Sequence, residues 1–299
     1  MTAKPLLAAA TLLSLLLTAA PLGAQHVNPA DAQRQEPKQE EHDERLGSWE
    51  MPPTVVRAAY EGMLREEDKI GDYGQPRWTA KRLFPTTRIY VVPEGKLEFE
   101  HWTRVKVPDE GQSTVETQYE LEIGLPHRFQ IDLYHVTEKT GSEGSLDLSE
   151  QKYELRYALA DWGKLWMNPT VYFEYVSRNA QADKVEYKLL LGDELSEGWH
   201  FGSNLVFEHE LDGAGENEYE LTMGLARTMI DEKLSLGGEM KAALVDVHED
   251  RGDYERSLEI GPSLQYRPLP QMHIDFAPLI GIGDDSRAAD IFLVLGWEF

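Results

Sequence analysis

Histidine, serine and amide side chains are the groups of this sequence that are suited to catalysis or metal binding, so their spacing comes first. His200 lies four residues before Asn204, and Ser203 lies six residues before His209. If the chain formed a β-barrel with an enzymatic site at its rim, an enzyme acting on lipid would use Ser203 and His209 as nucleophile and base. No G-x-S-x-G or H-E-x-x-H motif occurs, and the other histidines do not recur at metal-ligand spacing. We therefore expect no catalytic residue, no metal site and no cofactor.

Charged residues recur at every second position after residue 96 and alternate there with apolar residues. Successive side chains of a strand point to opposite faces, so each segment has one charged and one apolar face. If the apolar face meets lipid, the charged face lines the lumen of a barrel. The predicted lumen-lining residues are Glu98, Glu100, Glu122, Asp132, Glu154, Arg156, Glu174, Glu186, Glu208, Glu239, Glu259 and Asp275.

This period of two defines about twelve segments, each near the about 9–11 residues of a tilted membrane strand. We predict an all-β fold, an antiparallel up-and-down transmembrane β-barrel of about 12 strands over 96–299. The alternation alone also fits a soluble sheet protein whose apolar face is its core. The expected strands cover 96–107, 117–125, 129–134, 152–159, 171–177, 185–191, 199–211, 219–225, 234–244, 258–266, 272–282 and 289–299.

The last segment, 289–299, places Trp297 and Phe299 at the end of its apolar face. Amphipathic rings favour the membrane–water interface, so Trp199, Trp297 and Phe299 are the predicted interface aromatics. A terminal aromatic on such a strand resembles the C-terminal signal of bacterial outer-membrane barrels. That resemblance implies two partners, the barrel-assembly machinery and outer-membrane lipid. We expect the last strand to close the barrel against the strand near Lys96.

The connections between segments alternate between tight turns and longer acidic, glycine-rich loops. Outer-membrane barrels have short periplasmic turns and longer extracellular loops, so the alternation predicts an even strand count with both chain ends in the periplasm. The tight turns are 126–127, 230–233 and 268–271, and the acidic loops are 109–113, 141–144, 212–217, 249–253 and 284–286.

The N-terminal quarter of the chain has a different composition. Residues 1–24 are predicted to be a cleaved signal peptide, since Lys4 precedes an apolar run and small residues lead to Ala24. The chain has no cysteine, and its formal net charge of −24 argues against a nucleic-acid partner. Export and an alternating sequence together predict localisation to the cell outer membrane.

Residues 25–52 form a predicted disordered acidic linker, because they contain too few apolar residues to bury a core. Residues 53–95 are predicted to be a short amphipathic helix followed by a turn-rich segment that leads into the barrel. This region is compatible with a plug, a periplasmic docking helix or a lid, and the sequence does not choose. Residues 25–68 are the part expected to hold a periplasmic partner.

A seven-residue pattern repeats within the alternating region. The run YELEIGL at 119–125 matches YELTMGL at 219–225, and LEIG recurs at 258–261. In each copy an inward-facing glycine, Gly124, Gly224 or Gly261, ends the alternation. We expect these glycines to relieve crowding where a strand bends before its turn.

The runs GKLEFEHWTRVKV at 95–107 and TQYELEIGLPHRFQIDLYHV at 117–136 resemble the opening of a broad group of outer-membrane barrels. That group includes phenol-degradation MetA-pathway-like and transporter-like barrels, and the resemblance covers about 97–299. It rests on hairpin style, with no active-site motif, and implies passage of small molecules.

Three hypotheses for function remain open at this point. The first is a channel or transporter for small solutes, whose acid-rich lumen would favour cations or neutral solutes. The second is a closed structural or docking barrel that binds a periplasmic partner. The third, less favoured, is the rim enzyme acting on lipid.

Overall fold

The computed structural model describes residues 65–299, except 213–214, 248–250 and 284. The predicted signal peptide (1–24), the acidic linker (25–52) and residues 53–64, where most of the amphipathic helix was expected, lie outside the described residues. All described residues belong to one compact unit. Within this part of the chain, no helix is both long enough and apolar enough to cross a membrane.

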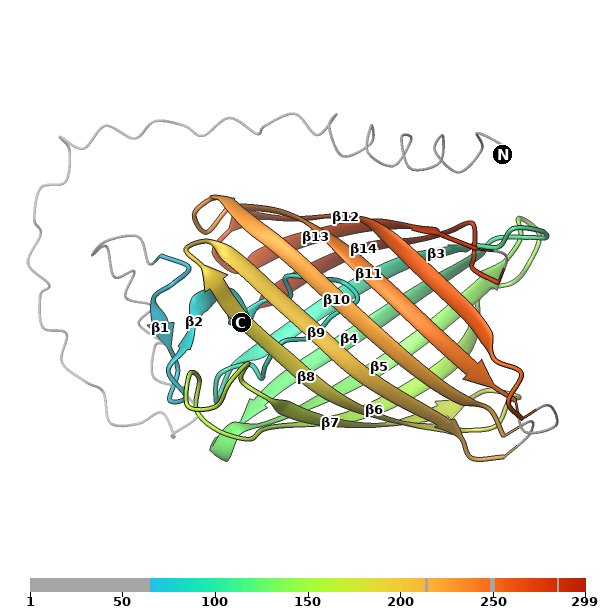
Figure 1. The fold of residues 1–299 in the computed structure, drawn as a ribbon, viewed down its shortest axis with the longest axis horizontal. Coiled ribbons are helices and arrows are strands. Elements are labelled where there is room, and N and C mark those ends of the chain that lie inside the picture. Colours follow the sequence, from blue (N-terminus) through green and yellow to red (C-terminus); the bar gives the residue numbers. More distant parts are fainter. Residues whose placement is uncertain (1–64, 213–214, 248–250, 284) are drawn as a thin grey trace, which may run out of the picture. The chain divides into compact units, whose positions relative to one another are not determined.

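Twelve antiparallel strands close into one barrel, in which each strand pairs with its neighbours in sequence (Figure 1). The predicted 12-strand barrel is therefore confirmed. Most strands extend beyond the ranges expected from the sequence. They are β3 (Leu97–Val107), β4 (Thr114–Leu125), β5 (Phe129–Thr140), β6 (Asp147–Ala158), β7 (Thr170–Arg178), β8 (Lys184–Ser196), β9 (Trp199–Glu210), β10 (Asn217–Ile230), β11 (Leu234–Asp246), β12 (Glu255–Leu269), β13 (Met272–Gly281) and β14 (Ala289–Glu298).

The barrel is closed by the pairing of its last strand with its first. β14 runs antiparallel to β3 from the pair Ala289–Val107 to the pair Glu298–Glu98. The N–H of Phe299 then donates to the carbonyl of Leu97 at 2.9 Å. The sequence-based prediction that the C-terminal strand closes the barrel against the strand near Lys96 is confirmed.

The two ends of the barrel differ in their connections. At the end that carries the C terminus, the turn end, four of the five connections are short: 126–128, 197–198, 231–233 and 270–271. The fifth, 159–169, is long, which departs from the expected alternation of tight turns with longer loops. At the opposite end, the loop end, the connections are 108–113, 141–146, 179–183, 211–216, 247–254 and 282–288.

The apolar face of the wall points outward. Leu97, Leu133, Leu155 and Leu205 are 40%, 43%, 42% and 51% exposed, whereas alternating residues such as Glu154 are buried inside. A soluble sheet protein would bury its apolar face as a core, because removing apolar surface from water is what stabilises it. The wall therefore has the reverse polarity of a water-soluble sheet.

Residues 65–96, which we call the plug, enter the barrel at the turn end (Figure 1). The plug contains a two-stranded pair, β1 (Lys69–Ile70) and β2 (Gln75–Pro76), and the short 3-10 helix η2 (Arg77–Ala80). Its apolar side chains form a buried cluster with two small residues of the wall, Ala158 and Ala226. The members from the plug are Tyr73, Trp78, Leu83, Phe84, Ile89, Tyr90 and Val91.

The repeated glycines of the wall have a different role from the one expected. A Cβ atom on Gly124 would overlap the carbonyl oxygen of Pro93, and one on Gly224 would lie 2.6 Å from the ring of Phe84. The absence of a side chain at both positions thus lets the plug pack directly against the wall. Only Gly261 fits the original explanation, since a Cβ atom there would overlap Pro278 of the neighbouring strand.

We predict that Gly124→Ala displaces the plug and leaves the barrel intact, because the new methyl group overlaps plug backbone and overpacking costs about 1–3 kcal/mol. The measurement is the rate of trypsin cleavage inside residues 77–88, which should rise about tenfold. Gly238→Ala is the matched control, because its Cβ would meet nothing closer than 3.4 Å. Equal cleavage rates in the two variants, both with the heat-dependent gel shift of a folded barrel, would contradict this role for Gly124.

Candidate functional site

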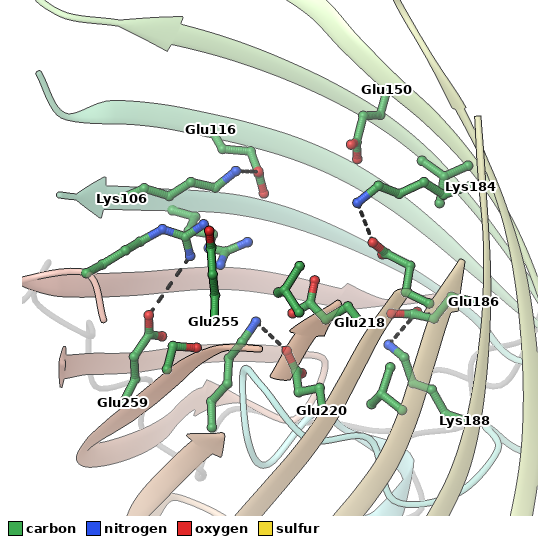
Figure 2. Close-up of a pocket in the computed structure, with 18 of the residues that line it drawn as sticks. Lys106, Glu116, Glu150, Lys184, Glu186, Lys188, Glu218, Glu220, Glu255 and Glu259 are labelled. Carbon is green, nitrogen blue, oxygen red and sulfur yellow. Dashed lines mark hydrogen bonds and ion pairs between the residues drawn. The ribbon is translucent and has the colours of Figure 1, made fainter. Parts of the chain in front are cut away.

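The lumen consists of two parts with different contents. The plug occupies the turn-end part, and toward the loop end the barrel encloses a cavity of about 420 Å³, which we call the vestibule (Figure 2). A second cavity of about 170 Å³, the deep cavity, is lined both by wall residues and by plug residues. The two cavities share Arg104, Glu116, Lys152, Glu186, Lys188 and Glu208, so the deep cavity lies between the vestibule and the plug.

The vestibule is lined almost entirely by charged side chains of both signs, and most face a partner on the same or a neighbouring strand. Figure 2 shows Lys106 beside Glu116 and Lys188 beside Glu186. The nitrogen–oxygen distances of these two pairs are 2.6 and 2.8 Å. Lys184 pairs with Glu208 in the same way. Exposed ion pairs contribute only about 0–1 kcal/mol each, so the lining mainly sets a polar, nearly balanced field.

The deep cavity has aromatic walls and a floor made by the plug. Pro85, Thr86 and Arg88 of the plug form part of its lining. Four inward-facing aromatic rings of the wall surround it: Trp102, Tyr134, Tyr172 and Phe292. A solute that descends from the vestibule would therefore meet the plug and an aromatic ring together.

Arg82 and Arg88 of the plug each lie within 4.0 Å of the same three wall carboxylates, and Arg82 makes the closer contact with Glu100. Its Nε donates to both carboxylate oxygens of Glu100, at 3.0 and 2.9 Å, and its Nη2 lies 3.2 Å from Glu120. The guanidinium carbon lies 4.1 Å from the ring centroid of Trp102. Arg82, Glu100, Glu120 and Trp102 are all buried. The wall thus holds this guanidinium by two carboxylates and one indole face.

Arg88 holds the same patch of wall from a second position. Its guanidinium contacts Glu120 and lies 2.7 Å from Glu122. Its backbone N–H donates to Asn204 Oδ1 at 2.8 Å, and Asn204 Nδ2 donates to its carbonyl at 2.6 Å. Asn204, which the sequence analysis noted only for its spacing from His200, therefore binds the backbone of the plug.

The start of the plug is held by a third polar group. Glu66 accepts hydrogen bonds from Thr228 and His200, and its other oxygen lies 3.1 Å from Arg267. The ring of His200 also stacks on Trp78 at 4.3 Å between centroids. Burial raises the pKa of Glu66, but the hydrogen bonds from His200 and Thr228 and the charge of Arg267 outweigh it, and the net pKa lies below its ordinary value.

The serine and histidine proposed for a rim enzyme do not meet. Ser203 and His209 lie on β9 six residues apart, which is roughly 20 Å along a strand. His209 instead lies 2.8 Å from Asn217 of β10. These two side chains therefore do not form a nucleophile–base pair.

The structure places the other sequence-selected residues as follows. Trp199, Trp297 and Phe299 lie at the turn end and are 37%, 40% and 71% exposed. Of the twelve lumen candidates, Glu186, Glu208 and Glu259 line the vestibule, and ten, Glu259 among them, are buried inside the barrel. Those ten are Glu98, Glu100, Glu122, Asp132, Glu154, Arg156, Glu174, Glu239, Glu259 and Asp275.

Sequence reasoning missed the plug arginines and the inward-facing aromatics. Trp102 and Phe292 were not assigned to the lumen, although Trp102 lies on the same strand face as Glu100, and Phe292 on the same face as Asp290. The signal available was a charge count, because the predicted lumen carried many more acids than bases. Arg82 and Arg88 lie just before the first barrel strand, in a segment otherwise rich in apolar residues, and were cations available to those acids.

Three groups of wall side chains have the ligand types and spacing for a metal ion, with donor atoms within 4.8 Å of one another, among the described residues. They are Glu98 with Glu100 and His273, Glu100 with Glu120 and Glu122, and Glu120 with Asp132 and Glu154. Protein donors already contact these carboxylates: His273 bonds Glu98 at 2.7 Å, and Arg156 lies 2.7 Å from Asp132. Their contacts are those of a protein-internal polar network.

Comparisons with known proteins give structural likeness alone. The sequence matches no protein-family model and no curated protein. Among solved structures, a NanC porin is 14% identical with a TM-score of 0.46, covering 68% of this chain and 98% of its own. An outer membrane channel from Pseudomonas putida F1 is 10% identical with a TM-score of 0.49, covering 73% and 100%. A KdgM porin, solved in complex with disordered oligogalacturonate, is 10% identical with a TM-score of 0.46, covering 68% and 99%.

We predict that acid loosens the start of the plug through Glu66. Because the pKa of Glu66 is lowered in the folded protein, its contribution is complete above its ordinary value of 4.5 and disappears as pH falls through the lowered value. Glu66→Gln should mimic the protonated state at neutral pH and reduce amide protection in 65–81 about tenfold, since charge-assisted hydrogen bonds become neutral ones. Hydrogen exchange followed by mass spectrometry measures this protection.

The control for this prediction is Glu67→Gln, because Glu67 is the adjacent carboxylate and is exposed. It should leave the protection of 65–81 unchanged. If Glu66→Gln retained full protection at neutral pH, or if wild-type protein lost the same protection well above pH 4.5, Glu66 would not be the group responsible.

Proposed function

We propose that this chain is an outer-membrane β-barrel that passes small solutes, and that its own plug closes the turn-end part of the lumen in the state described. The observation that carries the proposal is the reversed polarity of a closed barrel. Large apolar side chains cover the outside, and carboxylates, arginines and histidines are buried within. Lipid is the environment that suits such an apolar exterior. A closed barrel also leaves no backbone edge unpaired in the hydrocarbon.

Strand length and the two barrel ends support the same proposal. Strands of 9 to 15 residues are long enough for a tilted membrane strand, which needs about 9–11 residues. The turn end corresponds to the periplasmic side and the loop end to the cell exterior. In that orientation the plug enters from the periplasm, where an exported chain with a cleaved leader would place its N-terminal region. Trp199, Trp297 and Phe299 then lie at the periplasmic interface.

The lining of the lumen supports a preference among solutes. The vestibule is nearly balanced in charge, so it accepts polar solutes without strong rejection of either sign. The part of the barrel wall that surrounds the plug has many more carboxylates than cations. Such a lining favours cations and neutral solutes over anions. Membership of the phenol-degradation MetA-pathway-like group stays a prediction.

The plug itself favours a second candidate, a closed docking barrel. A lumen filled by buried hydrogen bonds and an apolar cluster is also what a permanently closed barrel would contain. In that case residues 25–68 would hold a periplasmic partner while the barrel served as the membrane anchor. The two candidates differ in whether removal of the plug produces conductance.

We predict that the full-length protein has low conductance in planar bilayers and that deletion of residues 66–95 produces stable open channels. The physical reason is that deletion joins the vestibule to the turn end by removing the apolar cluster between them. Reversal potentials in a salt gradient should show cation preference for the deletion variant. The heat-dependent gel shift shows that each protein is a folded barrel.

Gly238→Ala serves as the control for insertion efficiency, because it changes the wall away from the plug. If the deletion variant folded but gave no conductance, the channel proposal would be rejected and the docking barrel favoured. Equal, large conductance in wild type and deletion variant would instead show that the plug does not close the lumen in a bilayer.

A further inference from the structure

We infer that the wall carboxylates contacted by Arg82 and Arg88 form a binding site for an organic cation that carries guanidinium or ammonium groups. In the closed state the two plug arginines occupy this site as internal substitutes for the solute. The inference rests on the proposed function and specifies its substrate class. We call Glu100, Trp102, Glu120 and Glu122 the cation site.

The first support is the geometry around Arg82. Two carboxylates and an aromatic face are the groups that recognise a planar guanidinium, through charge-assisted hydrogen bonds and cation–π attraction. The structure has this set already assembled: Glu100 accepts from Nε, Glu120 lies 3.2 Å from Nη2, and Trp102 lies 4.1 Å from the guanidinium carbon. Trp102 Nε1 also donates to Glu100 at 3.0 Å, which fixes the indole beside that carboxylate.

The second support is the charge of the wall without the plug. Burying an ionised carboxylate without a partner is expensive, and such groups are normally paired with a cation. Withdrawal of the plug removes Arg82 and Arg88 from the cation site, and the wall supplies few cations of its own nearby. The buried wall acids of this region are Glu98, Glu100, Glu120, Glu122, Asp132 and Glu154, and the buried wall bases that contact them are Arg156 and His273.

The third support is access from the loop end. Trp102 and Glu120 line the deep cavity, and the deep cavity shares six lining residues with the vestibule. A solute that enters from the loop end therefore reaches the edge of the cation site before it meets the rest of the plug. Arg88 lies at the same place, since it also lines the deep cavity and contacts Glu120. An arriving cation thus competes directly with Arg88 for Glu120.

These contacts define the chemical class of the solute. The site offers carboxylates to two guanidinium groups that converge on Glu120, so a slender dication fits better than a monocation. Anions are rejected by the uncompensated carboxylates. A neutral solute of the same shape lacks the charge that stabilises those carboxylates when the plug leaves. The expected class is therefore a short alkyl chain with a guanidinium or ammonium group at each end.

Agmatine, which has a guanidinium and an ammonium group on a four-carbon chain, is the probe, and calorimetric titration of full-length protein in detergent is the measurement. Arg82→Ala combined with Arg88→Ala vacates the cation site, so this double variant should bind agmatine at least about tenfold more tightly than wild type. Adding Trp102→Leu or Glu120→Gln to the double variant should reverse most of that gain. Butylurea, a neutral molecule of similar length, is the control and should show no difference between the proteins.

A second measurement uses the wild-type protein and does not depend on the folding of any variant. Millimolar agmatine should lower the hydrogen-exchange protection of residues 82–92, because it competes with Arg88 and Arg82, whereas butylurea should not. No change in that protection, or a double variant that binds agmatine no better than wild type, would overturn the cation site. These outcomes are separate from the conductance test. A plug deletion that conducts without agmatine binding rejects the cation site alone, and a folded deletion that does not conduct rejects the channel.

Discussion

The structure depends on one electrostatic constraint, the burial of carboxylates on the inner face of a closed barrel. Glu100, Glu120 and Glu122 lie side by side on β3 and β4, and each is at most 2% exposed. Charges in such a place need partners of opposite sign, because desolvation costs several kcal/mol per ion. The wall supplies too few cations next to these three carboxylates. Arg82 and Arg88 of the plug supply the missing positive charges. The position of the plug follows from this requirement.

The same constraint explains the difference between the two parts of the lumen. Around the vestibule most basic side chains face an acid on the same or an adjacent strand, so the wall is nearly neutral without help from another segment. This part remains a water-accessible cavity. Behind it the wall is acidic, and the lumen is filled by a segment that brings both cations and apolar side chains. The plug therefore completes the wall electrostatically as well as sterically.

The barrel was predictable from the sequence because its information is periodic. Every strand repeats the same alternation, and the last one carries the alternation to Phe299, so the strand number and the pairing of β14 with β3 followed from a simple count. The plug has no regular alternation of apolar and polar residues. Its side chains Trp78, Phe84 and Tyr90 are buried by contacts with residues far away in sequence, which the local sequence does not reveal. The wall sequence did contain a sign of the plug, the glycines Gly124 and Gly224, but they were attributed to strand bending. They instead accommodate Pro93 and Phe84 of the plug. The carboxylate faces were found, but their partners required the three-dimensional structure.

The energetics of the plug indicate how a closed lumen can still open. Its apolar cluster provides stabilisation of the ordinary kind, at about 25 cal/mol per Å² buried. The Arg82 and Arg88 ion pairs add much less on balance, because desolvation offsets most of their attraction, yet breaking them leaves buried charges uncompensated at about 3–5 kcal/mol. A replacement cation removes that penalty, and a neutral molecule or an anion does not. The barrier to opening is therefore chemically selective: the carboxylates that hold the plug also determine which solute can take its place.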